Sequence, residues 1–554
     1  MTETAANSTP TTWEPPGPGS WVCDRSHHVA GPSRCFRRIV TEHTAPTYRK
    51  SFEEFGAPAG TVDMRFVNGS MFRRVVPLIA PDQDTGKVPP APVLWLASRL
   101  HPEFRRRNKR ALEMIERRSF LDDIRTWTST ERFEWKKRNL ELQAVDVAAL
   151  GDTELATHLR TLDAALVEGW IRHHQLHNND LGPIGDLLVH AEQWGMDQMK
   201  VMELLQGDSP ATVEAERHGK RIADALTAGG VDAVSVTDID TIRSVPAASA
   251  ALDEYLEEFG NRIVSDYDIE GRTLNEMPAA ICAIVRAGTS THERERPDEA
   301  PFRAKAADPA LFDQLLADAR LAYGVRDDNG PLTWEWRVGL LRLAYLEAGK
   351  RLAAAGRIKA PAHVFELDVP ELAVVLDGAT SPTAAALVER AEHRQWEKTL
   401  KAPDVLGPVP SNPDLSALPE GLRRLMGIIL TAVALLEPDL EEERVPLNGL
   451  GVGREPYQGI ARVAHDPGVV IEEMDPGDVL VAAWTAPSFN AVFAVAGAVV
   501  VQEGGLLCHA AVMARELGIA GVIGCADAMT EINSGDLIEV DPVAGVVTVL
   551  QPAA

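Results

Sequence analysis

Apolar residues recur at three- and four-residue spacing over the long middle of the chain. Leu155, Leu159, Leu162, Leu166 and Trp170 follow this spacing, and residues 311–323 and 338–352 repeat it. The spacing places apolar side chains on one face of an α-helix. Alanine, leucine, glutamate and arginine, which favour helices, are common in the same region. The pattern predicts a mostly helical region from about residue 100 to residue 400.

The period changes to that of β-strands near the C-terminus. Short segments rich in β-branched residues lie at 459–464, 478–484, 498–503, 521–525, 537–541 and 546–550. A helix is predicted over 509–517, after a Gly-Gly loop. The segment 449–453, Gly-Leu-Gly-Val-Gly, has no strand-to-helix unit around it and is interpreted as a turn. Residues 447–554 are therefore predicted to form a small α/β domain.

Proline and charged residues separate these two regions. Residues 402–420 hold five prolines and no helical period, a helix is predicted over 421–436, and 437–446 is charged. Such a composition is typical of a linker. The predicted organisation is a disordered tail at 1–20, a mostly helical domain at 21–400, a linker with one helix at 401–446, and the α/β domain at 447–554.

Charge and cysteine usage narrow the possible partners. The formal net charge of −26 repels phosphate backbones and anionic lipids, so neither nucleic acid nor a membrane is expected as a partner. The N-terminus lacks the basic start and apolar run of a secretory signal. The five cysteines include no CxxC pair, which argues against a disulfide framework or a zinc site. We expect a cytoplasmic protein.

His509 is the strongest candidate for chemistry. It falls at the start of the predicted helix 509–517, where unpaired N–H groups and the helix dipole favour an anion. Gly504 and Gly505 let the backbone turn tightly and approach a ligand. A neutral imidazole is a nucleophile near neutral pH. An isolated histidine in this position more often only caps a helix. At a helix start beyond a glycine loop, its side chain is not expected to fill the core.

The whole segment around His509 resembles a known motif. Residues 502–518 read Gln-Glu-Gly-Gly-Leu-Leu-Cys-His-Ala-Ala-Val-Met-Ala-Arg-Glu-Leu-Gly. This resembles the phosphohistidine motif of the phosphoenolpyruvate-utilising enzymes, and the resemblance extends over about 447–554. It implies a swivelling domain in which His509 accepts and passes on a phosphoryl group. Gly504, Gly505, Cys508 and Arg515 are then expected to support the phosphate, with Arg515 facing either the phosphate or a carboxylate.

Two positions depart from the family pattern. Ala520 stands where the family usually has proline, which should matter little. Cys508 replaces the usual serine or threonine, and a thiol is a weaker hydrogen-bond donor than a hydroxyl.

The resemblance also implies which parts a complete enzyme needs. The family combines an ATP-grasp nucleotide domain, the swivelling domain and an acceptor domain. The hundred residues before the helical region are too few for an ATP-grasp domain, and the chain ends soon after the last predicted strand, which leaves no room for a pyruvate-binding barrel. We therefore expect a separate ATP-grasp partner subunit to bind ATP and Mg²⁺, and no cofactor to be bound by this chain alone.

Residues 21–400 resemble, more weakly, the helical substrate domain of rifamycin phosphotransferase and phenylphosphate synthase. The resemblance lies in residues 19–28, 259–278 and 347–367. The candidate acceptor-binding residues are Trp21, Asp24, His27, His28, His177 and Arg262.

Each of these candidates has a structural alternative. The alternative for Trp21 is packing in a core, and the alternative for Arg262 is a structural ion pair. His173 and His177 share a helix face at a spacing that can bind a metal, but no third ligand is apparent, so no metal is predicted. Any of the histidines is also a candidate base for an acceptor hydroxyl.

Together these inferences predict a multidomain protein with a mainly α-helical N-terminal substrate domain and a C-terminal α/β swivelling phosphohistidine domain. We expect the phosphohistidine-carrying subunit of a two-component dikinase that phosphorylates the hydroxyl of a small, phenol-like molecule. A component of an antibiotic phosphotransferase and a non-catalytic regulatory protein remain as alternatives. A domain that swings is further expected to share only a modest, polar interface with the helical body.

Overall fold

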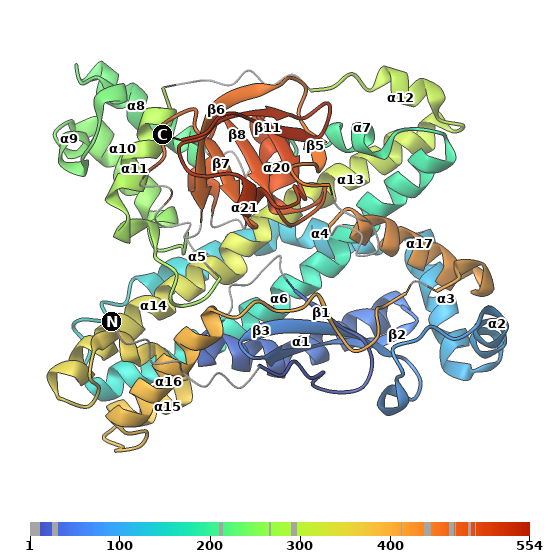
Figure 1. Cartoon of the computed structure of the whole chain (residues 1–554), viewed down its shortest axis with the longest axis horizontal. Coiled ribbons are helices and arrows are strands. Elements are labelled where there is room, and N and C mark those ends of the chain that lie inside the picture. The colour runs from blue at the N-terminus through green and yellow to red at the C-terminus, as the bar shows by residue number, and fades with distance from the viewer. Residues whose placement is uncertain are drawn as a thin grey trace.

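The computed structural model describes residues 11–24, 31–209, 214–264, 267–289, 296–411, 413–436, 445–464, 470, 473–485, 489–493 and 495–553. A helical body carries the C-terminal α/β domain (Figure 1). The orange and red C-terminal domain lies between α8–α11 on one side and α7 and α12 on the other. This is the predicted fold class.

Three long helical segments form the centre of the body. Helix α6 (Asp152–Gln193) is 42 residues long and packs against α13 (Pro309–Gly330). A π-helical segment, η5 (Pro331–Glu335), joins α13 to α14 (Trp336–Ala354). The predicted apolar stripe of α6, Leu155 to Leu166, is fully buried. The periodicity of the sequence thus identified the central helices correctly.

A small sheet, which the sequence pattern did not predict, covers α1 (Arg34–Phe55). Its strands are β1 (Trp21–Cys23), β2 (Ala59–Val67), β3 (Ser70–Pro77) and β4 (Val405–Leu406), in the order β2-β3-β1-β4. All pairs are antiparallel. Strand β4 comes from the predicted linker, so the chain returns to its own N-terminal region before the C-terminal domain begins.

Further helices surround this centre. They are α2 (Ala91–Leu100), α3 (Pro102–Arg117), α4 (Phe120–Thr126), η2 (Trp127–Glu131), α5 (Arg132–Gln143), α7 (Gln198–Glu203), α8 (Glu214–Ala228), α9 (Ile239–Arg243), α10 (Pro246–Phe259), α11 (Pro278–Ala287), α12 (Ala300–Lys305), α15 (Val369–Leu376), α16 (Ala384–Lys398) and α17 (Glu420–Ala434). Short 3₁₀ turns are η1 (Pro81–Gln83), η3 (Ala233–Ser235), η4 (Leu274–Glu276), η6 (Pro361–Glu366) and η7 (Leu415–Ala417). None of the helices among the described residues has the length and apolar character needed to cross a bilayer.

Two predicted boundaries need correction. Helix α17 packs on α3 and α6 with Leu422 and Leu425 buried, so the described part of 401–446 belongs to the body instead of forming a linker. Residues 11–20 of the predicted tail lie on the small sheet, where the ring of Trp13 is 6.1 Å from that of Phe72. In both places apolar side chains are buried on the body, which the proline-rich composition of these segments did not reveal.

The C-terminal domain is built on a seven-stranded sheet with the order β11-β10-β6-β7-β8-β9-β5. Its elements are β5 (Leu450–Val452), β6 (Tyr457–Ala464), β7 (Val479–Ala482), α19 (Asn490–Phe493), β8 (Ala498–Val501), α20 (His509–Leu517), β9 (Ala520–Ile523), α21 (Ala528–Glu531), β10 (Leu537–Asp541) and β11 (Val546–Gln551). Strands β6 to β9 are parallel. The predicted strands and helix are confirmed. The segment interpreted as a turn contains β5, which pairs antiparallel with β9.

The C-terminal domain packs on the body through a large apolar surface. Ile281 and Val285 of α11 share one buried cluster with Phe489, Val492 and Phe493 of the C-terminal domain. Leu507 and Val512 are likewise part of the core of the body. The expectation of a modest, polar interface is therefore wrong for this arrangement. The face of the domain that carries α19 and α20 is apolar, and water is excluded from it when the domain docks.

Candidate active site

His509 is the first residue of α20 and lies at the carboxyl edge of the parallel strands. Strands β7 and β8 pair in parallel, so the loops that follow them leave the sheet at the same edge. The loop after β7 carries Thr485, and the loop after β8 leads to His509. The Nδ1 atom of His509 is 3.1 Å from the Thr485 hydroxyl oxygen. This pairing fixes the orientation of the imidazole ring.

The other ring nitrogen of His509 points at the helical body. Nε2 is 4.0 Å from Oδ1 of Asp327 on α13. Phe493 of α19 contacts the imidazole edge-on, with 5.4 Å between ring centroids. The His509 side chain is only 7% exposed, although its position beyond a glycine loop suggested a side chain outside the core. Burial lowers the pKa of His509 to about 3, so the docked imidazole is neutral near pH 7.

The two glycines before His509 have different structural roles. Gly504 has φ +112°, and a Cβ there would lie 2.9 Å from Sγ of Cys508, so the turn requires glycine. At Gly505 a Cβ would lie 2.5 Å from the carbonyl oxygen of Leu435, which follows α17. Gly504 therefore shapes the loop, and Gly505 lets it approach the body. Burial raises the pKa of Cys508, so its sulfur is a neutral thiol. The expected support of a phosphate by Gly504, Gly505 and Cys508 stays a prediction.

Arg515 contacts the body rather than a carboxylate. Its Nη1 donates to the Tyr323 hydroxyl on α13 at 3.0 Å, and Nη2 donates to the Leu506 carbonyl at 3.3 Å. The next residue, Glu516, is also buried in the interface and accepts hydrogen bonds from the backbone N–H of Gly207 at 3.1 and 3.0 Å. Burial raises the pKa of Glu516 to about 7. The far end of α20 therefore holds the domain in its docked position.

The loop before His509 is joined to a buried polar network in the body. Arg326 donates to the Leu507 carbonyl at 3.1 Å and to Asp180 at 2.9 Å. Asp180 also contacts Nδ1 of His177 at 2.8 Å, and Asn329 lies 3.4 Å from the Nε2 of His177. His177, a predicted acceptor-site residue, is therefore linked to the loop of His509 through two ionic side chains.

Prolines in both central helices lie beside this network. Pro183 interrupts the hydrogen-bond ladder of α6 shortly after His177, and Pro331 ends α13 and begins η5. Helix α6 approaches η5 closely, because a Cβ at Gly169 would lie 1.9 Å from the Thr333 carbonyl. Single π-helical turns occur frequently at functional sites. Here the π-helical segment η5 begins four residues after Asp327 and ends at Glu335.

Aromatic side chains of both domains meet at Trp484, the residue before Thr485. Tyr267 of the body stacks on Trp484 of the C-terminal domain, with centroids 6.1 Å apart and planes at 15°. Trp484 also contacts Phe489 at 6.0 Å. Burial raises the pKa of Tyr267, and the charges of Glu335, Asp327 and Asp24 add to this rise. Asp24, another predicted site residue, is therefore near enough to Tyr267 for its charge to act on that hydroxyl.

Residues 474–545 match the family described as the mobile domain of PEP-utilising enzymes. The C-terminal domain is this mobile domain. The chain is 28% identical over 311 residues to an uncharacterised phosphotransferase, YvkC, of Bacillus subtilis, a match that covers 54% of this chain and 36% of that protein. It is 26% identical over 339 residues to a rifampicin phosphotransferase of Streptomyces sviceus, covering 56% of this chain and 36% of that protein.

A third match is shorter. Phosphoenolpyruvate synthase of Escherichia coli is 38% identical over 105 residues, which cover 18% of this chain and 13% of that enzyme. The chain thus spans about a third or less of these curated relatives. The matches establish the likeness to phosphotransferases of the PEP-utilising kind.

Several predicted residues lie away from the mobile domain's histidine. Trp21 packs with Phe72 and Leu406 in a separate cluster of the small sheet. Arg262 forms an ion pair with Glu258 at 3.1 Å, and its guanidinium lies 4.1 Å from the centre of the Phe259 ring. Those environments match the structural alternatives for Trp21 and Arg262. His27 and His28 lie outside the described residues.

No group of three histidine, cysteine or acidic side chains within the described ranges is arranged to hold a metal ion. His173 instead contacts Asn329, with 2.8 Å between Nδ1 and Oδ1.

The docked domain and the body also bring together residues that the sequence pattern did not indicate. Asp327, Glu335, Tyr267 and Thr485 carry no local motif. One sequence signal was present at Asp327 and close to Glu335. The run Asp327-Asp328-Asn329-Gly330-Pro331 interrupts an apolar helical stretch. Acidic residues beside a proline in a buried helix indicate a polar site.

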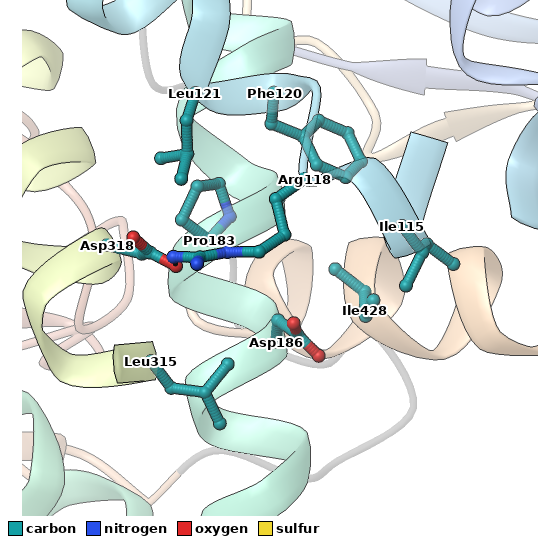
Figure 2. A pocket seen from close by; sticks show the side chains of 10 residues that line it. Ile115, Arg118, Phe120, Leu121, Pro183, Asp186, Leu315, Asp318 and Ile428 are labelled. Atoms are coloured by element: carbon teal, nitrogen blue, oxygen red, sulfur yellow. Dashed lines mark ion pairs between the residues drawn. The ribbon is translucent and has the colours of Figure 1, made fainter. Parts of the chain in front are cut away.

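A pocket on the body lies apart from this site. Arg118, Phe120, Pro183, Asp318 and Ile428 are among its lining residues, and Arg118 forms an ion pair with Asp318 across it (Figure 2). The pocket lies where α3, α4, α6, α13 and α17 meet, and none of the predicted site residues lines it.

Proposed function

We propose that this chain is a phosphotransferase component in which His509 carries a phosphoryl group to the hydroxyl of a small aromatic molecule. The observation that carries the proposal is the pose of His509. Thr485 holds Nδ1 from within the mobile domain, while Nε2 points across the interface to Asp327 of the body. A nucleophile on one domain therefore faces a carboxylate on the other.

The pose suggests a two-step transfer. If Nδ1–H donates to Thr485, the lone pair lies on Nε2, and the low pKa of His509 keeps it available. In the first step Nε2 bonds to the phosphorus of a donor, and the bond from phosphorus to the donor's leaving oxygen breaks. In the second step the acceptor hydroxyl bonds to phosphorus, the N–P bond breaks, and Asp327 takes the hydroxyl proton. The amides at the start of α20 stabilise the phosphoryl oxygens.

The aromatic character of the proposed acceptor is supported by the side chains around His509. Tyr267, Trp484, Phe489 and Phe493 are in mutual contact or in contact with the imidazole. Such side chains favour a flat, apolar ligand. An acceptor would enter when the mobile domain lifts, because Tyr267 and Trp484 cover each other in the docked position.

We further propose that the phosphoryl donor is ATP, bound with Mg²⁺ on a separate ATP-grasp subunit. Nε2 of His509 attacks the β-phosphorus and AMP leaves, and water then cleaves the terminal phosphate from the pyrophosphoryl group. The test mixes this chain with a candidate ATP-grasp protein and ATP labelled at the β-phosphate. Acid-labile label on His509 is expected only in the mixture. Label that reaches the chain from ATP without the second protein would overturn the separate-subunit proposal.

The central claim is testable without that subunit. Phosphoramidate transfers its phosphoryl group to imidazole nitrogens and releases ammonia, and peptide mapping by mass spectrometry reports whether His509 is modified. Phenol added to the modified protein should remove phosphate from His509 and yield phenyl phosphate, detected by ³¹P NMR. His509→Asn is the control, since it leaves other histidines to react. A phosphohistidine at position 509 that no phenol discharges would refute the aromatic acceptor.

A second acceptor class is favoured by one of the matches. The rifampicin phosphotransferase of Streptomyces sviceus aligns with more than half of this chain. Rifampicin in place of phenol in the same assay tests an antibiotic acceptor. Discharge by rifampicin but not by phenol would replace the first proposal, and discharge by neither would favour a regulatory phosphohistidine protein.

A further inference from the structure

Side chains from both domains close a ring beside His509. On one side, Nδ1 of His509 contacts Thr485, which follows Trp484, and Trp484 stacks on Tyr267. On the other side, Nε2 of His509 faces Asp327. Tyr267 is tied to the segment that follows α13, because the Trp334 indole N–H of η5 donates to the Tyr267 carbonyl at 2.9 Å. An acceptor placed for attack on a phosphoryl group at Nε2 would lie within this ring.

Glu335 is a further buried carboxyl on the body side of this ring. It ends η5, which follows the α13 helix of Asp327, and it comes directly after Trp334, the residue that donates to Tyr267. The side chain is 2% exposed. Its Oε1 atom is buried and has no hydrogen-bond partner among the described residues. A buried oxygen of this kind costs free energy unless a ligand or water supplies a partner.

The charged groups around Glu335 favour its neutral form. The charge of Asp327 raises the pKa of Glu335, and the charge of Asp24 acts on the neighbouring Tyr267. The facing cation is Arg262, which is already bonded to Glu258. Burial raises the pKa of Glu335 to about 8. A protonated carboxyl at neutral pH has a hydrogen atom to donate.

We propose that Glu335 binds the acceptor by donating a hydrogen bond to an uncharged oxygen remote from the reacting hydroxyl. This deepens, and rests on, the proposed phosphoryl transfer from His509 to an aromatic hydroxyl. The acceptor class that follows is a neutral hydroxyaryl molecule with a carbonyl group. An acceptor with its own carboxylate is disfavoured, because that charge would meet Asp24 and Asp327.

The test compares probes of the same size with and without the carbonyl oxygen. 3- and 4-hydroxyacetophenone carry it, and 3- and 4-ethylphenol lack it. Calorimetric titration of the full chain at pH 7 measures the dissociation constant of each. At least one hydroxyacetophenone should bind the wild type about tenfold more tightly than its ethylphenol counterpart, as expected for one hydrogen bond in a buried site.

Two substitutions assign that preference to Glu335. Glu335→Leu keeps the approximate volume and removes the donor, so the ratio of the two dissociation constants should fall to about one. Glu335→Gln keeps a neutral donor and should retain the preference. Glu366→Gln is the matched control: Glu366 is equally buried but bonded to Arg394 outside the ring, so the ratio should stay at the wild-type value.

Each outcome has a distinct meaning. An unchanged ratio in folded Glu335→Leu, or no binding of any probe by the wild type, overturns the proposal for Glu335. Thermal melting shows whether Glu335→Leu folds. If Glu335→Leu does not fold, Glu335→Gln provides the test, because loss of the carbonyl preference in Glu335→Gln also overturns the proposal. If ethylphenol discharges phosphorylated His509 and the dissociation constants show no preference for the carbonyl probes, the proposed role of Glu335 is refuted while the proposed function stands. No discharge by any probe would refute the proposed function itself.

Discussion

The two sides of the candidate site are held by different kinds of structure. On the mobile domain, the glycine turn, Cys508, His509 and Arg515 lie within one short stretch, and the turn and α20 position them locally. On the body, His177, Asp327, Glu335 and Tyr267 come from separate segments and depend on the packing of α6 against α13 and η5.

This difference separates the two half-reactions. Under the proposed function, phosphorylation of His509 is expected to need only the mobile domain and a donor. Transfer to an acceptor is expected to need the docked arrangement, because Asp327 reaches His509 only across the interface. Substitutions on the two sides should therefore affect different steps, and the predictions below test this in order of expected effect.

The largest effect is expected from His509→Asn. The variant should form no phosphohistidine at position 509 and transfer no phosphate, because the nucleophilic nitrogen is lost. Phosphate in the tryptic peptide that contains residue 509, measured by mass spectrometry, checks this. Turnover at the wild-type rate by the variant would remove the central claim.

His509 is nearly buried, so its variants also need a folding control. Asparagine retains a polar group beside Thr485 and should keep the thermal midpoint within a few degrees of the wild type. His509→Ala leaves a cavity beside Phe493 and should melt somewhat lower.

Asp327→Asn should uncouple the two steps. Phosphorylation of His509 by phosphoramidate should continue, while discharge by a phenol should slow by about 10²–10⁴-fold, the usual contribution of a general base. The rate of phosphohistidine loss after addition of phenol measures this. Asp328→Asn is a neighbouring control, since Asp328 accepts from Trp127 and pairs with Arg132 instead of facing His509. Equal discharge rates in Asp327→Asn and the wild type would exclude Asp327 as the base.

Gly505→Ala should weaken docking without removing any functional group. The added Cβ would approach the Leu435 carbonyl to 2.5 Å, and relieving that overlap is expected to cost about 1–3 kcal/mol of docking free energy. Discharge by a phenol should slow by roughly ten- to a hundredfold, and phosphorylation of His509 should persist. Gly427→Ala is the matched control, because a Cβ there meets nothing within 4 Å. A discharge rate as fast as that of Gly427→Ala would show that docking by this loop is not required.

The smallest effect concerns pH and the far end of α20. The pKa of Glu516 is raised to about 7 from an ordinary value of 4.5, so its protonated form is favoured in the folded, docked state. Its stabilising contribution is full below about pH 4.5 and is lost as the pH rises through 7. Integrated over that range, the change is on the order of 3 kcal/mol.

Thermal melting between pH 5 and 8.5 tests this. The midpoint of the wild type should fall with rising pH, and Glu516→Gln should reduce that fall. Asp180, with a pKa of about 7, and Glu335, with a pKa of about 8, act in the same direction and leave a residual slope. A variant with the full wild-type slope would show that Glu516 does not titrate in the interface.

The sequence by itself determined the features that depend on neighbouring residues. The spacing of Leu155 to Leu166 identified the buried face of α6, because a helix repeats every 3.6 residues. The β-branched segments identified the strands from β6 to β11, and His509 was found at the start of α20. All these signals lie within one helix, one strand or one loop.

Only the tertiary structure decided the other half of the site and the limits of the body. Asp327 of α13 faces His509, and Tyr267 of the body stacks on Trp484, only because the C-terminal domain docks on the body, and no local spacing encodes those contacts. Likewise, β4 pairs with β1, which lies almost 400 residues earlier in the sequence, although the proline-rich surroundings of β4 are typical of a linker. Burial of apolar side chains between distant segments decides such contacts, and that free energy is absent from any single segment.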